Sequence, residues 1–191
     1  MSLQLKFRYR FEAAHRFLAA HAPSCRTPHG HTWYATAIFR LRTDIESEAK
    51  LDEGAMAAEF GSLKKNWKAF ITETADHSYL HHHADPIIKT LLQDNPGARL
   101  LAFPTDPTTE MISGLFALKL TAMQKAETNP ALKNVELVGV HIQETPTNSI
   151  TFKFEKNGAT PKWLLDKIGD AQGWWSQPNV ADRSFIRGTS S

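Results

Sequence analysis

The chain has 191 residues, enough for one full domain and short for two, and its 41% hydrophobic and 22% charged residues are typical of an ordinary globular protein. A net charge of only +2 argues against a nucleic-acid surface built from bulk charge, and no apolar run approaches the about 20 residues that cross a membrane. With one cysteine and no apolar signal core near residue 1, we expect a cytoplasmic protein.

Two segments of alternating polarity begin the chain. Residues 3–11 place an apolar side chain at every second position, and residues 31–42 do the same. A two-residue period predicts strands with one buried face. Pro23 and Pro28 bracket the connection between the two segments, so we expect an antiparallel pair of strands joined by a loop that carries functional side chains.

Three histidines lie in this first unit at the spacing of metal ligands. His29 and His31 are two residues apart, so both side chains leave the same face of a strand. His15, at the end of the first alternating segment, could complete a facial set of three. Three imidazoles with an open position are typical of a catalytic zinc, because a structural zinc normally takes four protein ligands. The sequence therefore predicts a zinc site.

Cys25, the only cysteine, lies four residues before His29 and cannot form a disulfide within the chain. Beside a dication and imidazoles, its thiol would lose its proton more easily and become a usable base or nucleophile. Spacing alone leaves two roles open for Cys25, a fourth metal ligand or a catalytic thiolate.

The period changes in the middle of the chain. A turn and a short strand are expected over 43–58, and the helical spacing of apolar residues over 60–74 then predicts an amphipathic helix. Asp76 and His77 follow directly, and a carboxylate beside an imidazole can orient the ring and raise its basicity. We interpret the three histidines at 81–83 as a solvated loop, because adjacent side chains cannot all point at one ion.

Two further helices are predicted by Asp-Pro pairs, since a capping residue followed by proline favours a helix start. Asp85-Pro86 predicts a short helix, and Asp106-Pro107 predicts a long one that ends near Thr128 to Pro130. We expect residues 100–103 to form a short strand between them.

Two strands are expected near the end of the domain. Residues 135–144 are apolar enough for a strand buried on both faces, with Glu144 at its end, and residues 150–155 alternate. The composition shifts after residue 155, so we divide the chain into a domain of residues 1–155 and a C-terminal extension of residues 156–191. The extension holds a short helix and a tail whose Trp174-Trp175 pair packs on the domain or on a neighbouring subunit.

Four motifs occur in order along the chain: FEAAHRF, CRTPHGH, ADHSYL and PTTE, followed by Glu144-Thr145. The set resembles the 6-pyruvoyltetrahydropterin synthase family over residues 3 to about 155. The spacing between the cysteine and the HGH is similar to that of the bacterial 6-carboxytetrahydropterin synthases of queuosine biosynthesis. The segment between Tyr79 and Pro107 is longer than in compact members.

The resemblance implies an α+β tunnelling fold, with a four-stranded antiparallel sheet and helices packed on one face. Subunits of such a fold join their sheet edges into trimeric barrels that stack, which also covers the exposed edges of a small sheet. The expected assembly is therefore a homo-oligomer built from trimers, such as a hexamer, with active sites between subunits.

The resemblance also implies the chemistry. Zinc held by the three histidines would act on 7,8-dihydroneopterin triphosphate to give 6-carboxy-5,6,7,8-tetrahydropterin, with Cys25 and His77, oriented by Asp76, transferring protons. Glu144 resembles the anchor of the pterin ring. The remaining substrate residues implied are Thr108, Thr109 and Glu110 around the pterin. The resemblance does not assign the triphosphate ligands, for which Arg16 and Arg26 are candidates.

Three alternatives stay open. Glu110 could merely complement the helix N-terminus. The enzyme could stop at 6-pyruvoyltetrahydropterin, which keeps the whole side chain of the substrate. A non-catalytic pterin-binding protein is the third alternative, although pure binding does not need a proton-transfer group on either side of the substrate.

Overall fold

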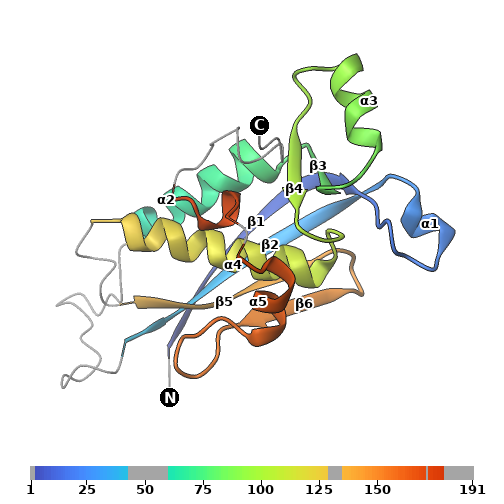
Figure 1. The fold of residues 1–191 in the computed structure, drawn as a ribbon. Helices are drawn as coiled ribbons and strands as arrows, with labels where there is room; N and C mark the ends of the chain where they lie inside the picture. Colours follow the sequence, from blue (N-terminus) through green and yellow to red (C-terminus); the bar gives the residue numbers. More distant parts are fainter. Residues whose placement is uncertain (1–2, 43–59, 129–134, 171, 179–191) are drawn as a thin grey trace.

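A computed structural model describes residues 3–42, 60–128, 135–170 and 172–178 of the chain (Figure 1). The turn and strand expected over 43–58 lie outside these residues. Strands β1 (Gln4–His15) and β2 (His29–Leu41) form the predicted antiparallel pair, with Phe11 opposite Trp33 and His15 opposite His29. A short helix, α1 (Pro23–Arg26), lies in the connection that was expected to be a loop.

In the described part of the chain the sheet has six strands in the order β4-β3-β1-β2-β5-β6, so the prediction of a four-stranded antiparallel sheet is wrong. The antiparallel part is present, because β5 (Val135–Gln143) pairs with β2 and β6 (Ser149–Lys153) pairs with β5. The sheet continues past β1 through two parallel pairings, which makes it mixed. These added strands are β3 (Ser78–His82) and β4 (Leu100–Phe103).

Strand β3 corrects the solvated loop predicted for residues 81–83. His81 is 1% exposed and pairs with Ala102 of β4, while His82 pairs with Phe103. Residues 78–80 of β3 pair with β1, whereas His81 and His82 pair with β4 alone. His81 is buried on the face opposite Leu80. Only His83, just past the strand, is exposed.

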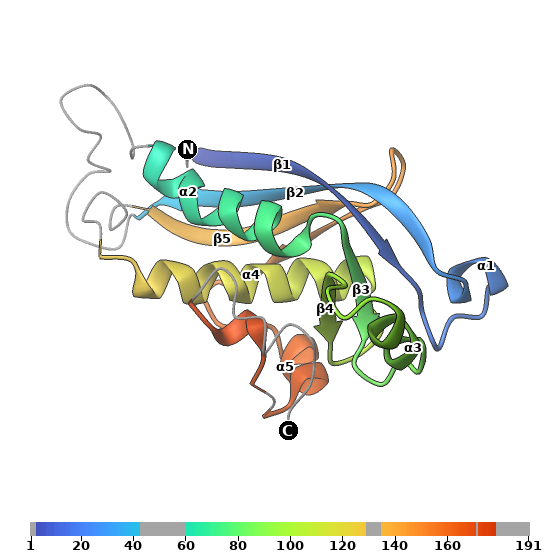
Figure 2. The same ribbon diagram turned by 90° about the horizontal axis from the view of Figure 1, so that it is seen from above.

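Two long helices pack on one face of the sheet, as expected (Figure 2). Helix α2 (Phe60–Phe70) continues into a π-helical turn at Ile71–Ala75, where the Asp76 amide donates to the Ile71 carbonyl at 2.8 Å. Of the predicted apolar stripe, the described side chains Leu63, Trp67, Phe70, Ile71 and Thr74 are buried. The π-turn ends the helix directly before Asp76 and His77.

Helix α4 (Thr109–Ala126) begins two residues later than the Asp106-Pro107 pair predicts. Its cap is Thr108, whose hydroxyl accepts a hydrogen bond from the Met111 amide at 3.3 Å. The Asp106 carboxylate is occupied elsewhere, since it accepts the amides of Leu18 at 2.8 Å and Ala19 at 2.9 Å. Asp106 therefore holds the chain that leaves β1.

Strand β5 is buried on one face only, which corrects the expectation of burial on both faces. Its register against β2 shifts between Ile38 and Phe39, so that Val138 has no opposite residue. The bulge returns Val140 and Ile142, both fully buried, to the face that carries the core.

The short helix α3 (Ile87–Asp94) follows Asp85-Pro86 as predicted, and the Asp85 carboxylate accepts the Ile87 amide at 3.0 Å. In the C-terminal part, α5 (Lys162–Ile168) and the 3-10 turn Trp174–Ser176 pack against α4. The Trp174 indole nitrogen donates to the Ala102 carbonyl at 2.7 Å, so the tryptophan pair packs on its own domain. Among the described residues, no helix is both long and apolar enough for a membrane span.

Candidate metal centre and substrate site

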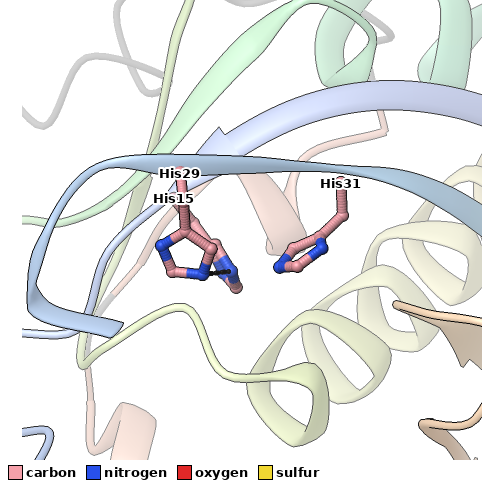
Figure 3. A group of neighbouring side chains, drawn as sticks. All are labelled: His15, His29 and His31. Carbon is pink, nitrogen blue, oxygen red and sulfur yellow. Dashed lines mark hydrogen bonds between the residues drawn. The ribbon is translucent and has the colours of Figure 1, made fainter. Parts of the chain in front are cut away.

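The strand register brings the three predicted histidines together. His15 lies opposite His29, and Ala13, two residues earlier on β1, lies opposite His31. All three side chains therefore leave the same face of the sheet and lie side by side (Figure 3). This face also carries the buried Phe11 and Trp33. One ligand nitrogen from each ring lies within 4.8 Å of the other two.

Backbone carbonyls determine which ring nitrogens face the centre. His15 Nδ1 lies 3.2 Å from the Pro107 carbonyl oxygen, and His29 Nδ1 lies 2.8 Å from that of Thr27. A carbonyl can only accept, so Nδ1 carries the proton in each neutral ring and Nε2 is left with a lone pair. Burial lowers the pKa of His15 to about 4, and burial also lowers the pKa of His31, so both rings are neutral at pH 7.

The arrangement fits a metal ion. The Nε2 atoms of His15 and His29 face each other at 3.1 Å, and two lone pairs at this distance repel unless a cation lies between them. Two nitrogens bound to one tetrahedral zinc at its usual distance are about 3.3 Å apart. The donor set is three imidazoles, of which His15 and His29 are held by outer carbonyls, and such a set suits zinc.

Glu144 follows β5 directly and lies beside this centre. Its Oε1 is 3.6 Å from His15 Nε2 and 3.9 Å from His31 Nε2, and its side chain is 16% exposed. Within the described residues, the side chain makes no hydrogen bond, so both carboxylate oxygens can accept from a ligand. The structure therefore brings Glu144 to the histidines.

Cys25 is not part of the histidine group. It lies in α1 and is half-buried, and its carbonyl accepts the Phe17 amide at 2.8 Å, which ties α1 to the end of β1. Its thiol makes no hydrogen bond within the described part of the chain. Of the two roles left open, the geometry favours the catalytic thiol over the fourth ligand, and that role stays a prediction.

Asp76 and His77 form the predicted pair. His77 Nδ1 lies 2.9 Å from Asp76 Oδ2, and Asp76 Oδ1 accepts the Glu12 amide at 2.8 Å. Burial alone would raise the pKa of Asp76, but the hydrogen bond from Glu12 and the interaction with His77 together lower it. His77 has a φ of 55°, uncommon for a residue other than glycine, and its side chain is 73% exposed. The ring is therefore held on one side by a carboxylate and open on the other.

The PTTE motif lies at the start of α4. Thr108 is the helix cap and Glu110 is exposed, and both line a cavity of about 450 Å³. Thr109 is the first residue of the helix, and no hydrogen bond of its side chain lies within the described residues. The substrate-binding roles of all three stay predictions.

Arg16 is engaged elsewhere. Its guanidinium forms two hydrogen bonds with Asp85, one of them 2.9 Å from Nε to Oδ2, and the triphosphate role suggested for Arg16 stays a prediction. Arg26 is exposed, and its side chain makes no hydrogen bond or ion pair in the described regions.

Two partners of the site escaped prediction from the sequence. Pro107 orients His15 through its carbonyl, and Asp106 holds Leu18 and Ala19. A backbone carbonyl leaves no signal in a sequence. The Asp106-Pro107 pair predicted only a helix start.

The chain resembles known proteins in both sequence and fold. The family model described as 6-pyruvoyl tetrahydropterin synthase matches residues 4–155. Among curated proteins, the 6-carboxy-5,6,7,8-tetrahydropterin synthase of Rickettsia bellii is 31% identical over 107 residues, which are 56% of this chain and 71% of that protein. The enzyme of the same name from Rickettsia felis is 29% identical over 106 residues, with the same coverage.

Solved structures share the fold. A Wolinella succinogenes protein gives a TM-score of 0.61 at 20% identity, covering 81% of this chain and 99% of that one. The 6-pyruvoyl tetrahydropterin synthase of Caenorhabditis elegans gives a TM-score of 0.51 at 23% identity, and the match covers 81% of this chain and 97% of that one. The fold and the relatives thus define a lyase of pterin metabolism, as predicted. The chain belongs to the 6-pyruvoyl tetrahydropterin synthase family.

Proposed function

We propose that the protein is a zinc-dependent lyase that converts 7,8-dihydroneopterin triphosphate and one water molecule to 6-carboxy-5,6,7,8-tetrahydropterin, triphosphate and a two-carbon fragment. The observation that carries the proposal is the set of three imidazoles whose lone pairs converge beside Glu144. The names of the Rickettsia relatives support the product. Queuosine biosynthesis is the proposed pathway, and the cytoplasm the proposed location.

His15, His29 and His31 would hold the zinc. When bound, zinc supplies Lewis acidity, which makes protons on carbon next to a coordinated oxygen more acidic. The reaction changes the side chain of the pterin, so that side chain must reach the histidines. We therefore assign Glu144 to the hydroxyl groups of the side chain, in place of the ring edge implied by the resemblance.

Cys25 and His77 are the proposed proton-transfer groups. A thiol can take and return a proton, and the carboxylate of Asp76, 2.9 Å from Nδ1, orients the ring of His77. The lowered pKa of Asp76 keeps that carboxylate ionised. The exposed ring of His77 is accessible to a second subunit, which supports an active site shared within a homo-oligomer built from trimers.

The rival is an enzyme that makes 6-pyruvoyltetrahydropterin, favoured by the name of the Caenorhabditis elegans structure. Mass spectrometry of the products formed from 7,8-dihydroneopterin triphosphate separates the two, because the pyruvoyl product keeps the whole side chain. The expected carboxy product has lost two carbons of that side chain. Binding of dihydropterins without turnover by the zinc-loaded protein would favour a non-catalytic binding protein.

A further inference from the structure

The backbone of His77 determines where its ring points, because within the described residues the side chain makes a single polar contact, the one to Asp76. The remainder of the side chain is open, with 73% of it exposed. The backbone itself has a φ of 55°, a left-handed conformation that is unfavourable for residues other than glycine and persists where surrounding contacts impose it. The contacts that hold this turn therefore position the ring.

Strand β1 holds the turn from one side through Glu12. The Glu12 amide donates to Asp76 Oδ1 at 2.8 Å, and the Glu12 carbonyl accepts the His77 amide at 2.6 Å. The other side of the turn is the end of a helix, since the π-helical residues stop at Ala75. The last carbonyls of a helix have no partner within it, so a donor from elsewhere is needed to hold them in place.

Arg99, the residue directly before β4, supplies this donor. Its guanidinium donates to three carbonyl oxygens of the helix end and the turn, those of Glu73 at 2.8 Å, Asp76 at 2.9 Å and Thr72 at 3.2 Å. The Arg99 carbonyl accepts the Tyr79 amide at 2.8 Å. Arg99 therefore contacts the chain on both sides of His77, through its side chain before the histidine and through its backbone after it.

The arrangement of these three carbonyls suits a guanidinium group. Nε of Arg99 donates to Asp76, while Nη2 donates to the two carbonyls of the helix end. A lysine has a single nitrogen at the end of its side chain and cannot serve both places with the same geometry. The positive charge is also favourable at the C-terminal end of a helix, although Arg99 is exposed and water weakens that attraction.

We propose that Arg99 is a positioning residue of the proton-transfer pair, because its guanidinium holds the turn in the conformation that presents His77 to the substrate. This inference rests on the proposed function. In this arrangement Arg99 acts through His77 and not on the substrate. Loss of its hydrogen bonds should therefore slow turnover and leave both zinc content and KM unchanged.

The test measures release of triphosphate from 7,8-dihydroneopterin triphosphate by zinc-loaded protein, which counts turnover whichever pterin product forms. Arg99→Met keeps most of the apolar stem and should lower kcat about tenfold with KM unchanged, a smaller loss than removal of an acid–base group would cause. Arg99→Lys keeps the charge, should lose only about threefold, and tests the proposal by itself if Arg99→Met does not fold. Arg40→Met is the matched control, because Arg40 is also an exposed, hydrogen-bonded arginine but lies at the other end of β2 from the histidines, and its kcat should equal that of the wild type.

A second readout does not depend on turnover. The His77 amide is held by the Glu12 carbonyl, so it should exchange its hydrogen with solvent faster in Arg99→Met and Arg99→Lys than in the wild type. Its exchange in Arg40→Met should be that of the wild type. Unchanged exchange in both Arg99 variants would show that the turn does not need Arg99, which would overturn the inference.

Two kinetic results would also overturn the inference while leaving the proposed function intact. One is a wild-type kcat in the Arg99 variants together with a lower free energy of unfolding, which would make the role of Arg99 purely structural. The other is a raised KM with an unchanged kcat, which would make Arg99 a ligand of the substrate in the cavity of about 560 Å³ that it lines together with His77. A wild-type protein that releases no triphosphate would refute the proposed function, and this inference with it.

Discussion

The change Glu144→Gln tests the proposed contact between protein and substrate. Glutamine keeps the size of the side chain, but it removes the charge and replaces one acceptor oxygen with a donor. In the structure, Oε1 of Glu144 lies 3.6 Å from His15 Nε2, and the side chain is 16% exposed, so bulk water replaces little of what is lost. A substrate hydroxyl that donates to this oxygen in the wild type would face the NH₂ group of glutamine, which is also a donor.

The expected loss follows from the strength of such contacts. A hydrogen bond to a charged group contributes about 1.5–3 kcal/mol, and Glu144 can accept two. The glutamine side chain in the variant keeps one of them in weakened form, so a net loss of about 2 kcal/mol corresponds to substrate binding roughly 30-fold weaker. Zinc content should not change, because the three histidines remain.

The assay is a titration of zinc-loaded wild-type and Glu144→Gln protein with the substrate, followed by fluorescence, with elemental analysis of both samples. Stoichiometric zinc in the variant rules out unfolding as the cause of weak binding. Wild-type affinity in the variant would show that the substrate is held elsewhere. Loss of zinc from the variant would instead make Glu144 a metal ligand, and the assignment to substrate hydroxyls would be wrong.

Three further outcomes are expected. His29→Ala should lose zinc and activity together, whereas His83→Ala, at an exposed position, should lose neither; full zinc occupancy in the first variant contradicts the site. Cys25→Ala should keep zinc and pterin binding but lose most turnover, and a zinc-free variant would mean that Cys25 is a ligand. Asp85→Asn should lower the free energy of unfolding by about 3 kcal/mol in a denaturant titration, because it leaves the charge of Arg16 half-buried without its partner. Burial raises the pKa of Asp85, but its hydrogen bonds with Arg16 lower the pKa overall. The stability that the pair contributes is therefore present above about pH 4 and is lost below it. Equal sensitivity of the wild type and the variant to acid would refute this reasoning.

The first hairpin and its site could be predicted because strand periodicity fixes the direction of side chains. Once β1 and β2 alternate, His29 and His31 must share a face, and the antiparallel register then places His15 opposite His29. The stripe of α2 follows from helical spacing in the same way. These inferences use only local backbone geometry and the pairing of β1 with β2.

The rest depends on long-range packing. Strand β3 carries no clear alternation, and three successive histidines suggest solvent, yet β3 joins the sheet between β1 and β4, and His81, paired with Ala102 of β4, is buried. Asp106 accepts the Leu18 amide and does not cap the helix, because the end of β1 lies beside it in the fold. Neither outcome can be read from neighbouring residues alone.

The central claim, a zinc-dependent lyase, is tested most directly by turnover before and after removal of the metal. Protein stripped with a chelator is incubated with 7,8-dihydroneopterin triphosphate, and product is measured as zinc is added back. The account predicts no product without zinc and full recovery at one zinc per chain, with 6-carboxy-5,6,7,8-tetrahydropterin as the product. Equal turnover by the stripped protein would contradict it.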